Sequence, residues 1–421
     1  MSQDMISVDE ARQRAIELAG NARFRMPVEE VDLFAAVGRV AAADLTSDID
    51  VAPFDNTAMD GFAVVASSLK DASEEAPVDL EIVDWVGAGV VSEVVLKPGE
   101  AIRIMTGGIM PQGADAVVKI EDTTFTGDGG VGERVRIFAP VTKTNVRKAG
   151  EEAKAGDVVV RKGEVIRAAT VGLLASTGNT VVPVHARPKA GVISIGTELV
   201  APSVKPEPGK IRDANAYVLG AYALELGCEV NLYPIVRDDE AAIRALFEQA
   251  IDECDFVVSS GGASNGDFDY AIETVRGLGE VVFDCVSLRP GKAQAFGCVG
   301  DTLVEVLSGN PAAAAVGFQL FGRPALRAMQ GYAELDRPVS DAILAQPTRK
   351  KEARAFYQRG HLEIGENGEL LVCQEEKQSS ALLSEMNRST VLIELPQGTG
   401  TFEVGTPVKC LHLDIDEGVV I

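Results

Sequence analysis

The sequence has few of the residues that build disulfide scaffolds and imidazole metal sites. Its six cysteines are scattered and form no C-x-x-C pair, which argues against a disulfide framework and against a zinc ribbon. Its three histidines, His185, His361 and His412, lie far apart in the sequence, so we expect almost no imidazole metal chemistry. If this protein handles a metal, carboxylates must bind it or the substrate must carry it.

Long apolar runs and an excess of basic charge are also missing. No apolar segment reaches the ~20 residues that a membrane-spanning helix needs, and the first residues lack the basic and apolar regions of a secretion signal. The formal net charge of −24 would repel nucleic acid over most of the surface. We therefore expect a cytoplasmic protein without membrane insertion or nucleic-acid binding. Solubility alone explains the charge, but a small anionic substrate could still bind a pocket with its own basic groups.

The N-terminal half changes its pattern along the chain, whose 421 residues indicate about three domains. Residues 5–20 have apolar residues at helical spacing, with Ser7 or Asp9 as a possible N-cap. Residues 28–50 read as a short helical and extended region. From about 47 to 150, short alternating segments broken by glycine and proline predict a β-rich insert.

The second half alternates strands and helices before it returns to a β pattern. Residues 188–330 contain repeated βαβ units, which predict a mostly parallel sheet in a three-layer αβα domain. The ligand site of such a sheet lies at the carboxyl ends of its strands. Residues 331–421 contain further candidate strands and predict a small C-terminal β domain.

The most informative stretch, residues 259–267, reads Ser-Ser-Gly-Gly-Ala-Ser-Asn-Gly-Asp and joins a predicted strand to a predicted helix. Gly261 and Gly262 allow close backbone approach, and the amides around Ser264 and Gly266 can face an anion at the helix N-terminus. The stretch matches neither the G-x-G-x-x-G fingerprint nor the Walker A loop. A glycine-rich turn without function is the alternative.

Two later turns carry groups that suit an anion. In Arg289-Pro-Gly-Lys292 two cations flank a tight turn, which suits phosphate, although a solvated surface turn explains it too. Ser308-Gly-Asn310-Pro311 opens an alanine-rich helix. Capping by Asn310 and a first-turn Pro311 explain this motif as well as binding of an oxyanion does.

Polar side chains also follow several predicted strands. Those of the αβα region are Glu198, Asp213, Asn215, Asp238, Asp239 and Asp269. Each acid alone is more often a helix cap or a solvated loop residue, but several at one sheet edge could hold a magnesium ion with substrate phosphates. In the insert, residues 55–61 and 103–108 combine turn residues with polar side chains.

These motifs together resemble the molybdopterin molybdenumtransferase family, which includes the C-terminal domain of gephyrin. The resemblance begins with Asp-Asn-Thr-Ala-Met-Asp-Gly at residues 55–61 and continues in the same order over nearly the whole chain. The matching segments are 55–63, 103–107, 113–118, 145–151, 194–199, 213–215, 237–239, 259–270, 290–292 and 309–311.

The resemblance implies an elongated α/β multidomain subunit with an αβα molybdopterin-binding domain, a β-rich insert and a β-barrel-like C-terminal domain. The implied domains are an N-terminal helix (1–26) packed on the αβα domain, a linking domain (27–46 and 151–187), the insert (47–150), the αβα domain (188–330) and the C-terminal β domain (331–421).

The resemblance also implies a reaction, in which molybdate is inserted into adenylylated molybdopterin and AMP is released with the help of Mg²⁺. The functional positions carried over are Asp60, Thr106, Glu198, Asp238, Asp269, Lys292 and Pro311. With the residues singled out above, the expected catalytic group is Asp60, Thr106, Glu198, Asp238 and Asp269, of which Glu198, Asp238 and Asp269 would also bind the metal. The expected substrate-binding group is Gly261, Gly262, Ser264, Arg289, Lys292, Asn310, Pro311, Asp213 and Asn215.

The resemblance further implies a homodimer with composite active sites, in which each insert lies over the partner's pocket, and it raises the possibility of contacts with other proteins of the cofactor pathway. Two segments depart from the family pattern. Arg289 and Ala293 replace the outer residues of Lys-Pro-Gly-Lys-Pro, while Ser308 and Ala313 replace a proline and a serine of Leu-Pro-Gly-Asn-Pro-Val-Ser. The serine hydroxyl missing at Ala313 is a plausible oxyanion donor. These departures support a second hypothesis, a gephyrin-like scaffold on the same fold with weak or no catalysis.

Overall fold

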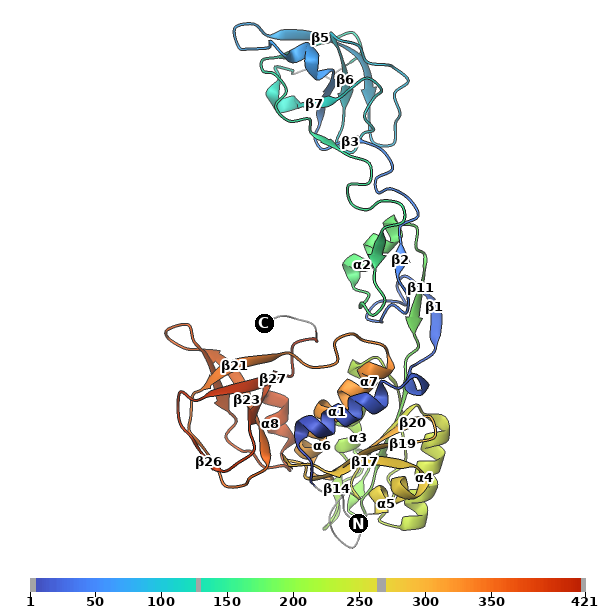
Figure 1. Cartoon of the computed structure of the whole chain (residues 1–421), viewed down its shortest axis with the longest axis vertical. Helices are drawn as coiled ribbons and strands as arrows, with labels where there is room; N and C mark the ends of the chain where they lie inside the picture. Colours follow the sequence, from blue (N-terminus) through green and yellow to red (C-terminus); the bar gives the residue numbers. More distant parts are fainter. Residues whose placement is uncertain (1–4, 126–129, 263–269, 418–421) are drawn as a thin grey trace.

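The computed structural model describes residues 5–125, 130–262 and 270–417. Figure 1 shows an elongated subunit, with a helix-covered sheet and a barrel at one end and a separate β-rich unit at the other. A narrow linking region joins the two ends. This arrangement confirms the predicted elongated α/β multidomain fold.

The central sheet has six strands in the order β15-β12-β16-β20-β19-β17. Their bounds are β15 (Glu229–Leu232), β12 (Lys189–Ser194), β16 (Phe256–Ser260), β20 (Thr302–Leu307), β19 (Ala293–Val299) and β17 (Glu280–Cys285). The first four strands are parallel, and β19 runs antiparallel to both of its neighbours. The sheet is thus mostly parallel, as predicted, but strand β19 had no counterpart in the sequence analysis.

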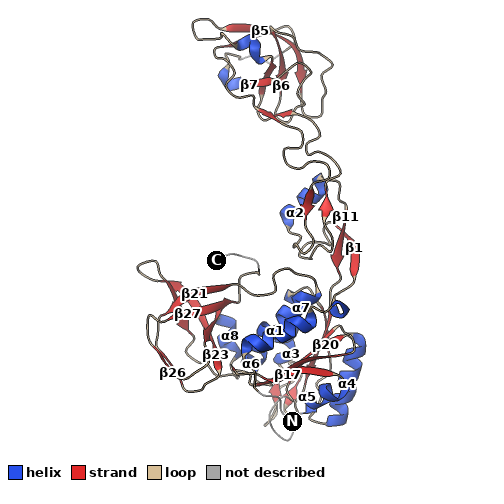
Figure 2. Cartoon of the chain, viewed as in Figure 1, coloured by secondary structure: helices blue, strands red, loops and turns tan. Residues whose placement is uncertain are grey.

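Helices cover both faces of this sheet and make it a three-layer domain. One face packs on α1 (Val8–Ala19), α3 (Asn215–Glu225), α6 (Pro311–Gly317) and α7 (Arg323–Met329). The other face packs on α4 (Glu240–Glu253) and α5 (Tyr270–Leu278). Figure 2 shows most of the helices of the chain gathered around this sheet. The predicted αβα domain is therefore confirmed.

Helix α1 forms where the apolar spacing predicts it. Ser7 is the N-cap, and its side chain accepts a hydrogen bond from the Glu10 amide at 3.1 Å. The buried stripe consists of Val8 and three alanines, whose small side chains let the helix approach the layer that contains α7. The alanine-rich helix predicted from Pro311 changes to π geometry over Phe318–Gly322, between α6 and α7.

The C-terminal region forms a closed barrel of five strands. The ring consists of β23 (Ala355–Ile364), β24 (Leu370–Gln374), β21 (Val339–Leu344), β27 (Pro407–His412) and β25 (Val391–Leu395), which pairs again with β23. A short strand of the αβα domain, β18 (Leu288–Arg289), adds to the outer side of β23. A ribbon of β22 (Thr348–Lys350) and β26 (Gly400–Phe402) and the short helix α8 (Leu383–Arg388) complete the region.

The insert contains a five-stranded sheet in the order β7-β4-β6-β5-β8. Its strands are β4 (Gly61–Val64), β5 (Val78–Val86), β6 (Glu100–Ile104), β7 (Ala116–Lys119) and β8 (Arg134–Ile137). Side chains of both faces are buried in two separate apolar clusters. A two-stranded ribbon, β3 (Asn56–Thr57) with β9 (Val146–Arg147), closes the end nearest the linking region.

The linking region pairs β1 (Val28–Asp32) with β11 (Val181–His185) and β2 (Leu45–Thr46) with β10 (Val158–Val160), beside helix α2 (Ala168–Ser176). The prediction of a helical segment within residues 28–50 is wrong. Turns follow β1 there, because the Asp32 carboxylate accepts hydrogen bonds from the amides of Phe34 and Ala35 and so holds a turn. Among the described residues, no helix combines the length and apolar character needed to cross a membrane.

Candidate active site

Two of the predicted acids lie together at the carboxyl edge of the αβα sheet. Asp238 follows β15 and Glu198 follows β12, and these two strands are parallel neighbours. Oδ2 of Asp238 accepts hydrogen bonds from both the amide and the hydroxyl of Thr197, each at 2.8 Å. The carboxylate of Glu198 lies over Gly196, where a Cβ would come within 2.7 Å of Oε2. Thr197 therefore holds Asp238 at the edge where a parallel sheet binds its ligands, and Glu198 is the next residue along the chain.

The turn after β16 requires glycine. Gly261 has a φ of 95°, and a Cβ at this position would lie 2.1 Å from the carbonyl oxygen of Ile195. Gly262 follows with a φ of 67°. Gly309 packs beside this turn, and a Cβ on Gly309 would lie 3.6 Å from the Cα of Gly261. Backbone thus packs on backbone between the β16 and β20 loops. Two predicted residues, Ser264 and Asp269, lie outside the described residues.

Asp213 and Asn215, both predicted to bind substrate, are buried and support the loops of this edge. Oδ1 of Asp213 accepts a hydrogen bond from the Ala216 amide at 3.1 Å in the first turn of α3. The Asn215 side-chain amide donates to Oγ of Ser260 at 2.5 Å and to the Gly309 carbonyl at 2.9 Å. Within the described residues its Oδ1 is buried without a partner. The structure thus places Asn215 between the two loops that it joins.

A cleft of 390 Å³ opens between the αβα domain and the barrel. Three cationic residues line it: Arg289 and Lys292 from the turn before β19, and Arg354 from the chain just before β23. Because β19 runs antiparallel to β20, this turn lies at the carboxyl edge of β20. The other lining residues are Pro290, Gly291, Ser308, Asn310, Ala313, Gln378, Ser379 and Ser380. Sequence analysis identified Arg289, Lys292 and Asn310 here but missed Arg354 and the segment 378–380.

Packing fixes the two guanidinium groups of the cleft. Arg289 lies over the ring of Phe356, 4.3 Å from its centroid, and is 3.6 Å from the carboxylate of Glu352. Arg354 donates a hydrogen bond to the Leu288 carbonyl at 2.9 Å and forms an ion pair with Glu352. The hydrogen bond from Arg354 is the main reason that the pKa of Glu352 lies below its usual value. One shared carboxylate therefore positions two cations while it neutralises only one charge.

A buried arginine of the barrel supports the opposite wall of the cleft. Arg359 is fully buried, and its guanidinium donates to the carbonyls of Lys377 at 3.3 Å and Ser379 at 3.0 Å. The Gln378 side chain accepts from the Arg359 amide at 2.9 Å and donates to the Arg359 carbonyl at 2.8 Å. Gln378 and Ser379 are thus held by the core of the barrel at the cleft.

The start of α6 also faces the cleft. Asn310 occupies the N-cap position and Pro311 the first helical position, as the motif predicts. The Asn310 side chain makes no capping hydrogen bond within the described part of the chain, and it is exposed. Asn310 thus lines the cleft and does not cap α6 through its side chain. Ala313 is buried one turn further along the helix, and it also lines the cleft.

In the insert, the two predicted residues are in direct contact. Asp60 precedes β4 and Thr106 follows β6, its antiparallel neighbour. The amide and the hydroxyl of Thr106 both donate to Oδ1 of Asp60, each at 2.6 Å. These hydrogen bonds, with help from the charge of Arg103, hold the pKa of Asp60 below its usual value. Gly61 must lack a side chain, because a Cβ there would lie 2.0 Å from the Val118 carbonyl oxygen.

The structure does not bring the two groups of predicted residues together within one subunit. Figure 1 places β3 and β6, beside Asp60 and Thr106, at the far end of the chain from β19 and β20. The linking region lies between them. Any site that uses both groups must therefore take the insert from another copy of the chain or from a different arrangement of the linking region.

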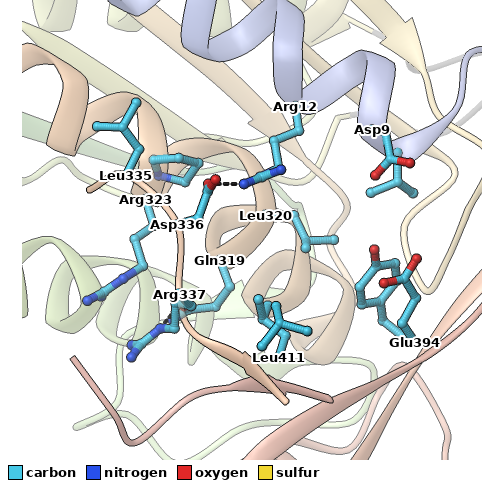
Figure 3. Close-up of a pocket in the computed structure, with 14 residues that line it drawn as sticks. Asp9, Arg12, Gln319, Leu320, Arg323, Leu335, Asp336, Arg337, Glu394 and Leu411 are labelled. Carbon is cyan, nitrogen blue, oxygen red and sulfur yellow. Dashed lines mark hydrogen bonds and ion pairs between the residues drawn. The ribbon is translucent and has the colours of Figure 1, made fainter. Parts of the chain in front are cut away.

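A second cavity, of 190 Å³, lies between α1, the π-helical turn and the barrel. Figure 3 shows Arg12 of α1 paired with Asp336, and Asp9 and Glu394 on the other side of the cavity. Burial, followed by the charge of Asp9, raises the pKa of Glu394. None of the predicted site residues lines this cavity.

Three family models together match most of the chain. Residues 6–178 match the MoeA N-terminal region, domains I and II. Residues 191–328 match a probable molybdopterin binding domain. Residues 341–413 match the MoeA C-terminal region, domain IV.

Full-length relatives agree with these matches. The chain is 35% identical to the molybdopterin molybdenumtransferase of Bacillus subtilis, over 98% of this chain and 95% of that protein. It is 33% identical to the enzyme of the same name from Staphylococcus aureus, over 98% and 96% of the two chains. The solved structure of the molybdopterin biosynthesis MoeA protein from Pyrococcus horikoshii superposes with a TM-score of 0.80 at 29% identity, and covers 97% of this chain and 100% of that one. The chain therefore belongs to the molybdopterin molybdenumtransferase family.

Proposed function

We propose that this protein inserts molybdate into adenylylated molybdopterin and releases AMP, as the names of its relatives suggest and the family resemblance implies. The observation that carries the proposal is the cleft lined by Arg289, Lys292 and Arg354, at the ligand-binding edge of the αβα sheet. Three cations with serine hydroxyls suit a tetrahedral oxyanion and phosphate oxygens. In a chain of net charge −24, such a cluster calls for a specific ligand.

The residues of the cleft would act mainly by binding and orientation. Arg289 is held by the Phe356 ring and Arg354 by the Leu288 carbonyl, so little reorganisation is needed when an anion binds. Ser379 and Ser380 add hydroxyl groups from the barrel side. Oxygen atoms of molybdate and of the substrate's phosphates would thus be fixed close to each other, which lowers the entropic part of the barrier.

The acidic pair fits a magnesium ion. Glu198 and Asp238 supply carboxylate oxygens at one sheet edge, the ligand type that Mg²⁺ prefers. Both hydrogen bonds that Thr197 donates to the Asp238 carboxylate go to Oδ2. We assign these two residues, with Asp269, to metal binding. A magnesium ion held there would offset the negative charge of the phosphoanhydride. Arg289, Lys292 and Arg354 would contribute the remaining positive charge.

The distribution of the acids favours a homodimer with composite sites. Asp60 and Thr106 form a preorganised pair on an insert that lies far from its own αβα sheet. In a two-fold dimer each insert can reach the partner's cleft, and both sites are equivalent. We therefore divide the subunit into an insert, residues 47–150, that serves the partner's site, and an αβα domain, residues 188–330, that holds the substrate.

Mixing two inactive variants tests the composite site. Chains with Asp60→Ala and chains with Glu198→Ala should regain activity when subunits exchange, because one site of each mixed dimer contains neither lesion. Random pairing sets the ceiling at about a quarter of wild-type activity. The matched control mixes Glu198→Ala with Lys292→Ala chains, whose lesions share one domain, and this mixture should stay inactive. Exchange without recovery in the first mixture would assign the whole site to one chain.

The test of the proposed function itself is AMP release from adenylylated molybdopterin, measured with and without molybdate and Mg²⁺. We expect release that depends on both ions, and a higher molybdate concentration needed for release in the Arg354→Ala variant. No AMP release under any of these conditions would contradict the proposal. Beyond the sequence departures at Ser308 and Ala313, no structural observation on the described part of the chain favours the second hypothesis, a scaffold with little catalysis.

A further inference from the structure

A group of metal-ligating side chains lies on the barrel, outside the candidate active site. His361 and Glu363 lie on β23, and Cys373 lies opposite His361 on the antiparallel strand β24. One ligand atom from each of these three residues lies within 4.8 Å of the others. The sequence analysis expected almost no imidazole metal chemistry, because the three histidines lie far apart in the sequence. Strand pairing instead places a cysteine beside His361.

A fourth side chain, Glu375, contacts the other nitrogen of the His361 ring. Oε1 of Glu375 lies 3.0 Å from Nδ1 of His361, and Oε1 of Glu363 lies 3.3 Å from Nε2 of the same ring. Residues two apart on a strand share a face, so His361 and Glu363 on β23 point the same way. Cys373 and Glu375 are related in the same manner, although Glu375 lies just beyond the end of β24.

The four side chains lie on the outer face of the barrel. Leu362 and Val372, which alternate with them and pair across the two strands, belong to the apolar core instead. His361 is 40% exposed and Glu375 is 11% exposed, so the site is open to a solvated ion yet partly enclosed. Within the described residues, the only basic side chain within ion-pair distance of Glu363 or Glu375 is that of His361.

We propose that His361, Glu363 and Cys373 bind a divalent transition metal ion of the zinc class, while the Glu375 carboxylate accepts a hydrogen bond from Nδ1 of His361 and orients the ring. The donor set decides the class: Zn²⁺ accepts imidazole nitrogen, thiolate and carboxylate in a tetrahedral shell, whereas Mg²⁺ prefers oxygen ligands alone. When the ion binds, bonds form to the sulfur and to a ring nitrogen. The thiol proton, and the second imidazole proton where it is present, leave to solvent.

The local electrostatics define the charge that a bound cation would have to offset. Burial raises the pKa of the Cys373 thiol, and the neighbouring Glu363 and Glu375 carboxylates raise it further. Without a metal, the carboxylates of Glu363 and Glu375 both contact the one imidazole of His361. A divalent cation would compensate the carboxylates and the thiolate together. The site would also tie β23 to the start of the segment that carries Gln378 and Ser379, since the Glu375 carbonyl accepts from the Gln378 side chain at 3.0 Å.

The experiment uses the full chain, treated with chelator, and titrates it with Co²⁺ alone. One equivalent should produce a thiolate-to-cobalt charge-transfer band, which Zn²⁺ should displace and excess Mg²⁺ should leave unchanged. Cys373→Ser should abolish the band. His361→Ala and Glu375→Gln should each lower the Co²⁺ affinity at least about tenfold. The matched control is Cys285→Ser, which removes another partly buried thiol in the αβα domain and should retain the band.

Several results would overturn the proposal. These are the absence of a band in the wild-type chain, a band that persists in Cys373→Ser, and displacement by Mg²⁺. Should Cys373→Ser fail to fold, the affinities of the His361→Ala and Glu375→Gln variants, relative to Cys285→Ser, give the same decision. None of these measurements depends on the transferase reaction.

Discussion

A buried glutamate in the centre of the αβα sheet predicts a measurable pH dependence of stability. Glu305 lies on β20 between Val258 and Phe296 on the neighbouring strands, and is only 1% exposed. Neither carboxyl oxygen has a hydrogen-bond partner of good geometry among the described residues. The carboxyl group faces Gly322 of the π-helical turn, where a Cβ would lie 2.2 Å from Oε2. The mechanism proposed above does not use this group.

Burial raises the pKa of Glu305 from 4.5 to about 8, and the amide of Gly322 opposes this only in part. Each pKa unit corresponds to about 1.4 kcal/mol, so the ionised form costs the folded state about 5 kcal/mol. The folded chain holds the proton more tightly than the unfolded chain does. Below the pKa that Glu305 has in the unfolded chain, this group does not lower the unfolding free energy. The unfolding free energy falls as the pH rises from that pKa to the pKa of Glu305 in the folded chain, and above the second value the loss is complete.

The assay compares the wild-type chain with Glu305→Gln, which keeps the shape of the side chain but cannot ionise. Between pH 5.5 and pH 8.5 the wild-type chain should lose about 3 to 4 kcal/mol of unfolding free energy relative to the variant. Urea unfolding should be followed by the circular dichroism of helices, because the only tryptophan, Trp85, lies in the insert and would report on another domain.

The exposed Glu207→Gln is the matched control and should have the pH dependence of the wild-type chain. Equal pH dependence in the wild-type chain and in Glu305→Gln would refute the reasoning. The carboxylate would then be solvated or paired when it ionises.

Three further predictions concern the candidate site. Arg354→Ala should raise the molybdate KM by about tenfold to a hundredfold, the range expected for the loss of one charge-assisted contact. The control, Arg349→Ala, changes an exposed arginine and should leave this KM unchanged. Equal effects of the two substitutions would argue that the cleft does not bind molybdate. Asp60→Asn should lower kcat about 10²-fold, while unfolding followed by circular dichroism stays unchanged. Near wild-type turnover would show that the Asp60–Thr106 contact only stabilises its loop. Ala313→Ser should lower the molybdate KM about threefold to tenfold by adding one hydroxyl donor, and an unchanged KM would show that this position does not touch the anion.

The sequence predicted the elements whose pattern is local. Helix α1 was predictable because its cap and its buried stripe are both visible in the sequence. Strand β19 was not, because its residues, Ala-Gln-Ala-Phe-Gly-Cys-Val, include small and polar ones with little strand preference. It is held by pairing on both sides, and Gly297 is required where a Cβ would lie 2.0 Å from the Glu280 carbonyl oxygen. That requirement comes from tertiary structure alone.

Strand β23 escaped prediction for a similar reason. Its centre contains buried Gln358 and Arg359, which break the alternation that marks a strand in a sequence. The carbonyls of Lys377 and Ser379 accept hydrogen bonds from Arg359 and make its burial possible. No spacing rule reveals such distant partners.

The candidate site was predictable where one motif supplies the chemistry, and not where the fold assembles it. Arg289 and Lys292 lie in one short turn, so their shared role could be read from the sequence. Arg354 joins them only because β18 pairs with β23 in parallel register, Leu288 opposite Ala355. The group of His361 and Cys373 depends in the same way on the register of β23 with β24. In each case a strand pairing between distant segments creates the arrangement.

The local charge of the cleft also explains how a strongly acidic chain can bind an anion. At physiological ionic strength the Debye length is about 8 Å, so most of the acidic surface acts only weakly on an anion inside the cleft. Arg289, Lys292 and Arg354 line the same 390 Å³ and act at much shorter range, with Glu352 offsetting one of the three charges. The net charge of −24 thus disfavours long polyanions, which must contact a wide surface, more than the small anion that we propose for the cleft. Selectivity for a small oxyanion would follow from this difference in range.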